Sequence, residues 1–151
     1  DDLDAYQKTI QRFIPYSDIL KVSEDEVCFI TGKSNIEDGI QQLLSYPLDL
    51  LIVTKGKDGV TFYTKSEEKT VPGYRVKAID TTGAGDSFIG AFLYQFGLTD
   101  KDISKINARE LQEMGTFANA AAALVTTKEG AISALPSKEE IKKFIDEAVT
   151  T

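Results

Sequence analysis

The sequence of 151 residues contains no histidine and no tryptophan, and it has only one cysteine and one methionine. Without histidine the chain cannot supply a Ser-His or Cys-His nucleophilic triad or a histidine-ligated zinc. Carboxylates are therefore the natural candidates for proton transfer. The lone cysteine, Cys28, has no partner within the chain for a disulfide, and its apolar helical context predicts a buried structural thiol.

Basic residues are fewer than acidic ones, 17 against 24, which gives a formal charge of −7. Binding to nucleic acid requires a clustered basic surface, so we expect no nucleic-acid partner. Long apolar runs and a secretory leader pattern are also lacking, which predicts no membrane partner and a cytoplasmic location. The first residue is Asp1 and a helical pattern begins at once, so we expect a piece of a longer protein.

The remaining composition, 42% hydrophobic and 27% charged, is that of a globular chain, and no linker divides it. We therefore expect residues 1–151 to belong to one domain. Apolar periodicity predicts helices over residues 3–13, 24–30, 36–46, 88–96, 108–126 and 138–149. Strands are predicted over residues 17–22, 49–55, 60–65 and part of 68–78, with a break at Pro72 and Gly73. The alternation predicts the α/β class with a mainly parallel central sheet flanked by helices.

The segment DTTGAGDSFIGAF, residues 80–92, places small residues where a helix begins. Gly83, Ala84 and Gly85 let the backbone approach a ligand, and the unpaired N–H groups of a first helical turn attract an anion such as phosphate. Asp86 adds a negative charge that would oppose plain phosphate binding. The conflict disappears if Asp86 takes a proton from a hydroxyl that attacks a phosphoryl group. The alternative is that Asp86 caps the helix and the small residues ease packing.

The same segment resembles the carboxy-terminal signature of the ribokinase-like (PfkB) family of carbohydrate kinases. Three further stretches match in the expected order: SDILKVSEDE, LIVTKGKDGV and ANAAAALVTTKEGAISALP. Within the family the sequence is most similar to a bacterial fructokinase, in its carboxy-terminal half. The resemblance implies a ribokinase-like fold and ATP-dependent phosphorylation of a sugar hydroxyl, with fructose as the expected sugar.

The resemblance also implies roles for individual residues. Asp86 matches the catalytic base, and Gly83, Ala84 and Gly85 match the anion hole for the transferred phosphate. The nucleotide is expected along a segment that begins at Thr54 and contains Gly56 and Gly59, although GKDG on its own also fits a plain hairpin turn. Asn119 matches a polar position beside the adenine, or it hydrogen-bonds a neighbouring helix.

Two cation sites follow from the family pattern. Asp80 and Thr82, with carbonyls of Val125, Lys128 and Gly130, match a site for a monovalent cation such as K⁺. Alanine at position 134, where some relatives supply a hydroxyl, would weaken that site. Asp80 is equally interpretable as an ordinary turn residue.

The second site concerns Mg²⁺ and the nucleotide. In SEDE, Ser23 takes the place of a family asparagine, and Glu26 matches a glutamate that orders water around the magnesium ion. Serine reaches less far, which puts its nucleotide contact in doubt. The alternative is a helix start in which Ser23 is the N-cap and Glu26 completes a capping box.

The family's amino-terminal half, which carries most sugar contacts and the lid, has no counterpart in this sequence. We therefore expect the isolated chain to be inactive, with its partners being nucleotide, sugar, and either the missing half or further copies of the chain. Alternatives are a regulatory relative that binds nucleotide without catalysis, and a kinase for another sugar or a nucleoside.

Overall fold

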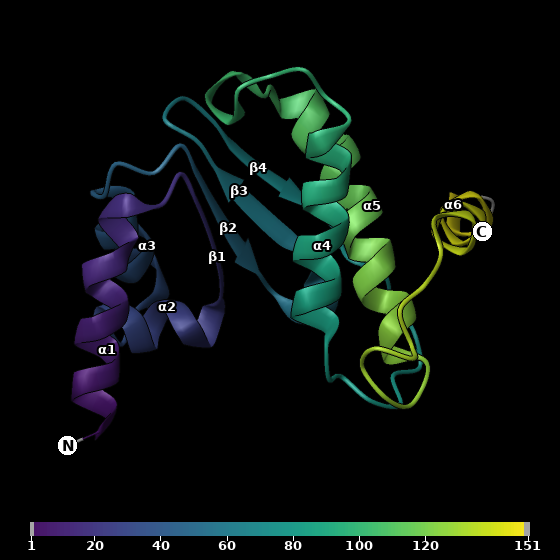
Figure 1. The fold of residues 1–151 in the computed structure, drawn as a ribbon, viewed down its shortest axis with the longest axis horizontal. Coiled ribbons are helices and arrows are strands. Elements are labelled where there is room, and N and C mark those ends of the chain that lie inside the picture. Colours follow the sequence, from purple (N-terminus) through teal and green to yellow (C-terminus); the bar gives the residue numbers. More distant parts are fainter. Residues whose placement is uncertain (1, 150–151) are drawn as a thin grey trace.

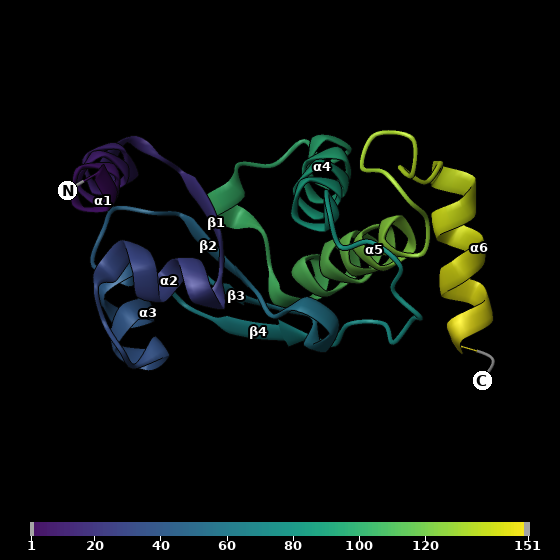
Figure 2. The same ribbon diagram turned by 90° about the horizontal axis from the view of Figure 1, so that it is seen from below.

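The computed structural model describes residues 2–149, which form three layers with one further helix outside them (Figure 1). One face of the sheet is covered by α1 (Asp2–Phe13), α2 (Glu24–Thr31) and α3 (Ile36–Leu44). The other face is covered by α4 (Ala84–Gly97) and α5 (Ala108–Thr126). The last helix, α6 (Lys138–Val149), packs on the outside of α5 (Figure 2).

The sheet has the order β1-β2-β3-β4, with β1 (Ile19–Ser23), β2 (Leu50–Thr54), β3 (Val60–Tyr63) and β4 (Glu68–Val71). Only β1 and β2 are parallel, and they are joined by a crossover through α2 and α3. The other two pairs are antiparallel. The α/β class is confirmed, but within this chain the sheet is mixed rather than mainly parallel. The connections from β2 to β3 and from β3 to β4 are too short for the crossover that parallel strands need.

β2 is the central element of the core, because its side chains are buried on both faces of the sheet. Leu50 and Ile52 pack toward α4 and α5, whereas Leu51 and Val53 pack toward α1, α2 and α3. Side chains alternate between the two faces of a strand, so a continuous apolar run is what a doubly covered strand requires. The strand predicted there is confirmed.

The helices begin and end near the predicted positions, with one exception. α4 begins at Ala84 rather than at residue 88, because the small residues that the sequence marks as a turn already form its first turn. Cys28 in α2 has a free thiol and is half-buried, less than expected.

None of the helices within residues 2–149 has the length and hydropathy needed to cross a bilayer. The cytoplasmic location stays a prediction from the sequence.

Candidate active site

The turn that leads into α4 is built by short polar contacts and one glycine. Asp80 Oδ1 accepts a hydrogen bond of 2.9 Å from the backbone N–H of Thr82. Gly83 is the N-cap residue of α4 and has a φ of 80°, a conformation that side chains disfavour. A Cβ atom on Gly83 would also lie 2.9 Å from Cβ of Ala131. Glycine is therefore required here by both conformation and space.

The first turn of α4 presents free backbone donors beside an unengaged carboxylate. Among the described residues, the N–H groups of Gly85 and Asp86 have no acceptor, as expected for a first helical turn. The Asp86 side chain is exposed, and α4 has no side-chain cap. The alternative that Asp86 caps the helix is therefore wrong. Its carboxylate remains available at the positive end of the helix dipole.

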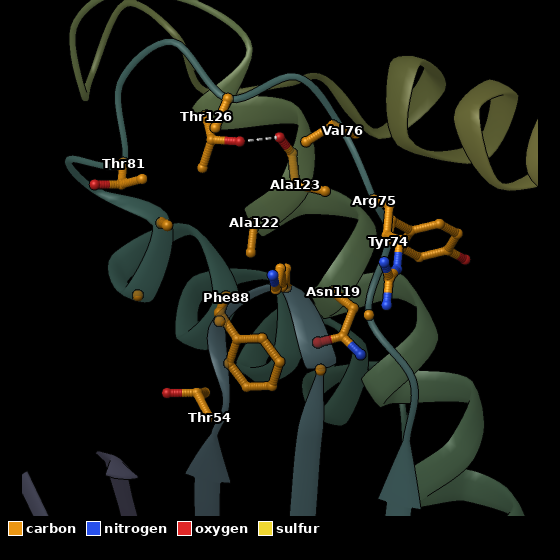
Figure 3. Close-up of a pocket in the computed structure, with 17 residues that line it drawn as sticks. Thr54, Tyr74, Arg75, Val76, Thr81, Phe88, Asn119, Ala122, Ala123 and Thr126 are labelled. Atoms are coloured by element: carbon orange, nitrogen blue, oxygen red, sulfur yellow. Dashed lines mark hydrogen bonds between the residues drawn. The ribbon is translucent and has the colours of Figure 1, made fainter. Parts of the chain in front are cut away.

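Two cavities meet at this turn. The larger, about 530 Å³, lies between the end of β2, the start of α4, the carboxyl-terminal part of α5 and the chain after β4 (Figure 3). Ala84 and Gly85 line it. Asp86 lines the smaller cavity, about 380 Å³, together with residues of α4, α5 and α6. Consecutive residues of one helical turn, Gly85 and Asp86, thus line two different cavities.

The segment expected to contact nucleotide does line the larger cavity, through Thr54, Gly56 and Gly59. It is also the hairpin connection of the alternative interpretation, because a 3-10 turn at Gly56–Asp58 joins β2 to β3. Gly59 has a φ of 103°, and a Cβ atom on it would lie 2.5 Å from the backbone nitrogen of Gly73. Two stretches of main chain therefore cross at contact distance and form part of the cavity wall.

Asn119 projects from α5 at the edge of the same cavity, as Figure 3 shows, and is 6% exposed. Its Nδ2 donates hydrogen bonds to the carbonyl oxygens of Val71, at 3.2 Å, and Pro72, at 3.0 Å. The alternative of a bond to a neighbouring helix is wrong, since both acceptors belong to the end of β4 and the residue after it. The amide fixes α5 against this chain segment and thereby shapes the cavity.

Three of the residues expected around a monovalent cation, Asp80, Thr82 and Gly130, are joined by hydrogen bonds. Asp80 Oδ2 accepts a hydrogen bond of 3.3 Å from the N–H of Gly130, which joins the loop before α4 to the loop after α5. Hydrogen bonds from the Thr82 hydroxyl, the Thr82 N–H and the Gly130 N–H hold the pKa of Asp80 below its ordinary value of 3.8. Asp80 is thus a turn residue, and it remains ionised above that pH.

The carbonyls expected at the cation site come from the end of α5. Val125 lies in the last turn of this helix and its carbonyl accepts a bond of 3.5 Å from Lys128 N–H. The carboxyl end of a helix carries partial negative charge, which together with Asp80 suits a cation. Ala134, where a further hydroxyl ligand would stand, is buried.

Ser23 and Glu26 form the capping box that the sequence allows. Ser23 Oγ accepts a bond of 3.2 Å from Glu26 N–H, and Glu26 Oε2 accepts one of 2.7 Å from Ser23 N–H. The structural interpretation is therefore confirmed. A role of Glu26 toward magnesium stays a prediction.

Sequence reasoning missed several residues at the site. Gly73, Arg75, Val76 and Ala123 line the larger cavity, and only folding brings them there. Lys21, on β1, was also missed: a Cβ atom on Gly85 would lie 2.9 Å from its Nζ. A single charge within the otherwise apolar run ILKV, residues 19–22, is the signal that would have found it.

Comparisons with known proteins identify the family and the fold. The model of the pfkB family of carbohydrate kinases matches residues 1–138. Probable fructokinase-5 of Arabidopsis thaliana is 49% identical over 131 residues, which is 85% of this chain and 40% of that protein. The chain thus spans about two-fifths of the length of the curated relatives it matches.

Solved structures show the same fold. The fructokinase of Vibrio cholerae O395, in its form with fructose, ADP and calcium ion bound, has a TM-score of 0.85 and 36% identity, over 92% of this chain and 44% of that one. Aminoimidazole riboside kinase of Salmonella enterica, complexed with aminoimidazole riboside and an ATP analog, has a TM-score of 0.84 and 32% identity, over 96% of this chain and 48% of that one. The central sheet, the turn before α4 and the matches along the chain together place this protein in the pfkB family of carbohydrate kinases.

Proposed function

We propose that this chain is the nucleotide-binding and catalytic half of an ATP-dependent sugar kinase whose substrate is fructose. The observation that carries the proposal is the first turn of α4, where the unpaired N–H groups of Gly85 and Asp86 adjoin the unengaged carboxylate of Asp86. Phosphoryl transfer needs both parts, a set of donors for the phosphoryl oxygens and an acceptor for the hydroxyl proton.

In the proposed reaction, Asp86 takes the proton of a sugar hydroxyl as the hydroxyl oxygen forms a bond to the γ-phosphorus of ATP. The bond from that phosphorus to the oxygen bridging the β- and γ-phosphates breaks, and ADP leaves with the electron pair. Asp86 then releases the proton to solvent. Within the proposed anion hole of Gly83, Ala84 and Gly85, the Ala84 N–H already donates to the Thr81 carbonyl oxygen at 3.2 Å, so the unpaired N–H groups of Gly85 and Asp86 stabilise the charge on the phosphoryl oxygens during the transfer.

The larger cavity is the proposed binding site of the nucleotide. Its walls are mostly main chain and small side chains, which leave room for a ribose and an adenine between Thr54, Gly59 and Asn119. Bound Mg²⁺ would neutralise phosphate charge, with Glu26 holding a water of its shell. K⁺ would be held by Asp80, Thr82 and the carbonyls of Val125, Lys128 and Gly130.

The position of Asp86 supports an acceptor that approaches from the side opposite to the nucleotide. Ala84 and Gly85 line the larger cavity, whereas Asp86 lines the smaller one across the same helical turn. This arrangement fits an in-line transfer, in which attacking and leaving oxygens lie on opposite sides of the phosphorus.

Fructose is proposed because fructokinases are among both the curated relatives and the solved structures. The test is a panel of sugars and nucleosides with MgATP, using the full-length protein and detecting ADP. We expect the highest kcat/KM with fructose. A higher value with a riboside would assign the protein to another substrate class within the family, and no turnover with any acceptor would contradict the kinase function.

A further inference from the structure

One wall of the larger cavity is a chain segment without helix or strand. Residues 73–78 follow β4, and most of them line the cavity: Gly73, Tyr74, Arg75, Val76 and Ala78. Within the described chain, the backbone N–H and C=O groups of residues 73–78 take part in no hydrogen bond. Main-chain hydrogen bonds therefore do not fix the position of this wall, and side chains must do so.

Hydrogen bonds hold the chain only just outside this segment. On one side, Asn119 Nδ2 donates to the Pro72 carbonyl oxygen at 3.0 Å. On the other side, the Ile79 N–H donates to the Thr126 carbonyl oxygen at 2.7 Å. Of residues 73–78, only Tyr74 belongs to any apolar cluster of the described chain. Tyr74 is therefore the residue that can fix the segment between its two ends.

Tyr74 contacts the last helix, α6, through its ring. The rings of Tyr74 and Phe144 meet edge-on, with centroids 5.0 Å apart and an interplanar angle of 61°. In Figure 3 the Tyr74 ring points away from the cavity, on the far side of its own segment from Phe88 and Ala122. The ring pair thus attaches the cavity wall to α6 from outside and leaves the inner side of the wall free.

The Tyr74 ring, rather than its hydroxyl group, makes this attachment. The hydroxyl group takes part in no hydrogen bond among the described residues. Burial raises the pKa of Tyr74 above its ordinary value of 10.0. Both rings pack against one apolar cluster between α5 and α6, formed by Phe117, Ala120, Ala121 and Ile141.

We propose that Tyr74 and Phe144 are positioning residues for the nucleotide, through which α6 holds one wall of the larger cavity in place. The inference rests on the proposed function, in which this cavity takes ATP. A contact surface keeps its geometry only when the residues behind it are themselves held. Asp86 lines the other cavity, so we expect the ring pair to affect nucleotide affinity and not the chemical step.

The test compares Phe144→Ala with Ile145→Ala in the full-length protein. Ile145 is the matched control, because it follows Phe144 on α6 and is also half-buried against the same cluster, but it has no ring to contact Tyr74. Phe144→Ala should weaken ADP binding about tenfold, the size expected for loss of one aromatic pair, and raise KM for MgATP similarly. Both kcat and KM for fructose should stay within about twofold, and Ile145→Ala should leave all four values within about twofold.

Variants of Tyr74 test whether the ring is responsible. Tyr74→Phe keeps the ring and should retain ADP affinity, whereas Tyr74→Ala should lose as much as Phe144→Ala. The double variant should lose little more than either single variant, because the two residues act through one contact. Additive losses, or equal losses in Phe144→Ala and Ile145→Ala, would overturn the proposal. If Phe144→Ala does not fold, Phe144→Leu removes the ring with less loss of volume.

Trypsin provides a readout that needs no nucleotide, because Arg75 and Lys77 are exposed within the segment. Phe144→Ala should speed cleavage at these two sites about tenfold in nucleotide-free protein, with the sites mapped by mass spectrometry, and Ile145→Ala should not. A wild-type protein that binds no ADP would contradict the proposed function, and the cleavage rates would still decide whether the ring pair holds the segment. ADP binding by the wild type with unchanged affinity in Phe144→Ala would overturn the role of α6 alone.

Discussion

Asp80 Oδ2 and the backbone N–H of Gly130 form a hydrogen bond of 3.3 Å that joins two loops far apart in the sequence. The first loop ends at the turn that starts α4, and the second follows α5. The same carboxylate accepts the Thr82 N–H, so one side chain holds the turn and attaches it to a second segment. The position of Asp86 therefore depends on Asp80.

The contribution of Asp80 to stability should depend on pH. Its folded-state pKa is lowered, first by the Thr82 hydroxyl, so its stabilisation is complete above the ordinary value of 3.8 and is lost as the pH falls through the folded-state pKa. We expect Asp80→Ala to lower the denaturant midpoint at neutral pH, with the difference from wild type narrowing below about pH 4. Asp100→Ala, at an exposed position, is the control. A difference that stays constant down to low pH would contradict the assignment.

Asp86→Asn in the full-length protein should lower kcat by about a hundredfold or more, because the amide cannot accept the hydroxyl proton. ATP affinity should change by no more than about threefold, since the N–H donors remain. Steady-state kinetics and calorimetry with MgATP measure the two effects. Near-normal turnover of the purified variant would refute the assignment of Asp86 as base, and Asp100→Asn controls for a change in net charge.

The two glycines of the turn should respond differently to alanine. Gly83→Ala should reduce the free energy of unfolding by about 1–2 kcal/mol, because alanine is strained at positive φ and meets Ala131. In Gly85→Ala the added methyl group contacts only the flexible end of the Lys21 side chain. The midpoint of thermal unfolding should therefore stay unchanged while turnover falls. Scanning calorimetry and kinetics on both variants separate the effects. Similar loss of stability in both would favour a packing role for the whole turn.

Asn119→Asp should destabilise the protein by about 1–3 kcal/mol, because it replaces a donor by an acceptor opposite two carbonyl oxygens. Nucleotide affinity should fall as well, since the cavity wall moves. Asn35→Asp is the matched control, because Asn35 uses only its side-chain oxygen, as acceptor at the start of α3. Denaturant unfolding and ADP titration test both expectations. Equal stability of the two variants would show that the bonds to Val71 and Pro72 contribute little.

The isolated chain, residues 1–151, should bind MgATP weakly and should not phosphorylate fructose efficiently. The larger cavity, in which we propose that nucleotide binds, is lined by residues of this chain, but a base accelerates the reaction only when the acceptor hydroxyl is held within its reach. Calorimetry and a coupled assay measure the two properties. Turnover near an ordinary value, about 10 per second, would show that the sugar site lies within this chain.

The sequence predicted most of the secondary structure, because apolar periodicity and end signals agree at most elements. β2 is the clearest case, with a run of apolar residues that only a doubly covered strand explains. The start of α4 was missed because Ala84 and Gly85 fit a turn as well as a helix. The mixed sheet was missed because strand direction depends on the length of the connections, which a composition argument does not weigh.

The grouping of small residues with Asp86 at the start of α4 was also predictable, because these residues are neighbours in the sequence and need no folding to meet. The approach of Lys21 to Gly85 was not, because it depends on which face of β1 meets α4. The crossing of Gly59 and Gly73 was likewise hidden, since it arises from the register of β3 and β4.

The crossing of Gly59 and Gly73 determines where the cavity can be redesigned. A Cβ atom on Gly73 would lie 2.5 Å from the Lys57 carbonyl oxygen, so neither glycine tolerates a side chain without movement of the backbone. Substitution of either glycine therefore cannot change the shape of this cavity wall without moving the main chain. For the nucleotide that we propose to bind here, the positions open to larger or polar side chains are on α5, where Ala122 and Ala123 line the same cavity. A library aimed at nucleotide selectivity should therefore vary α5 and leave the hairpin unchanged.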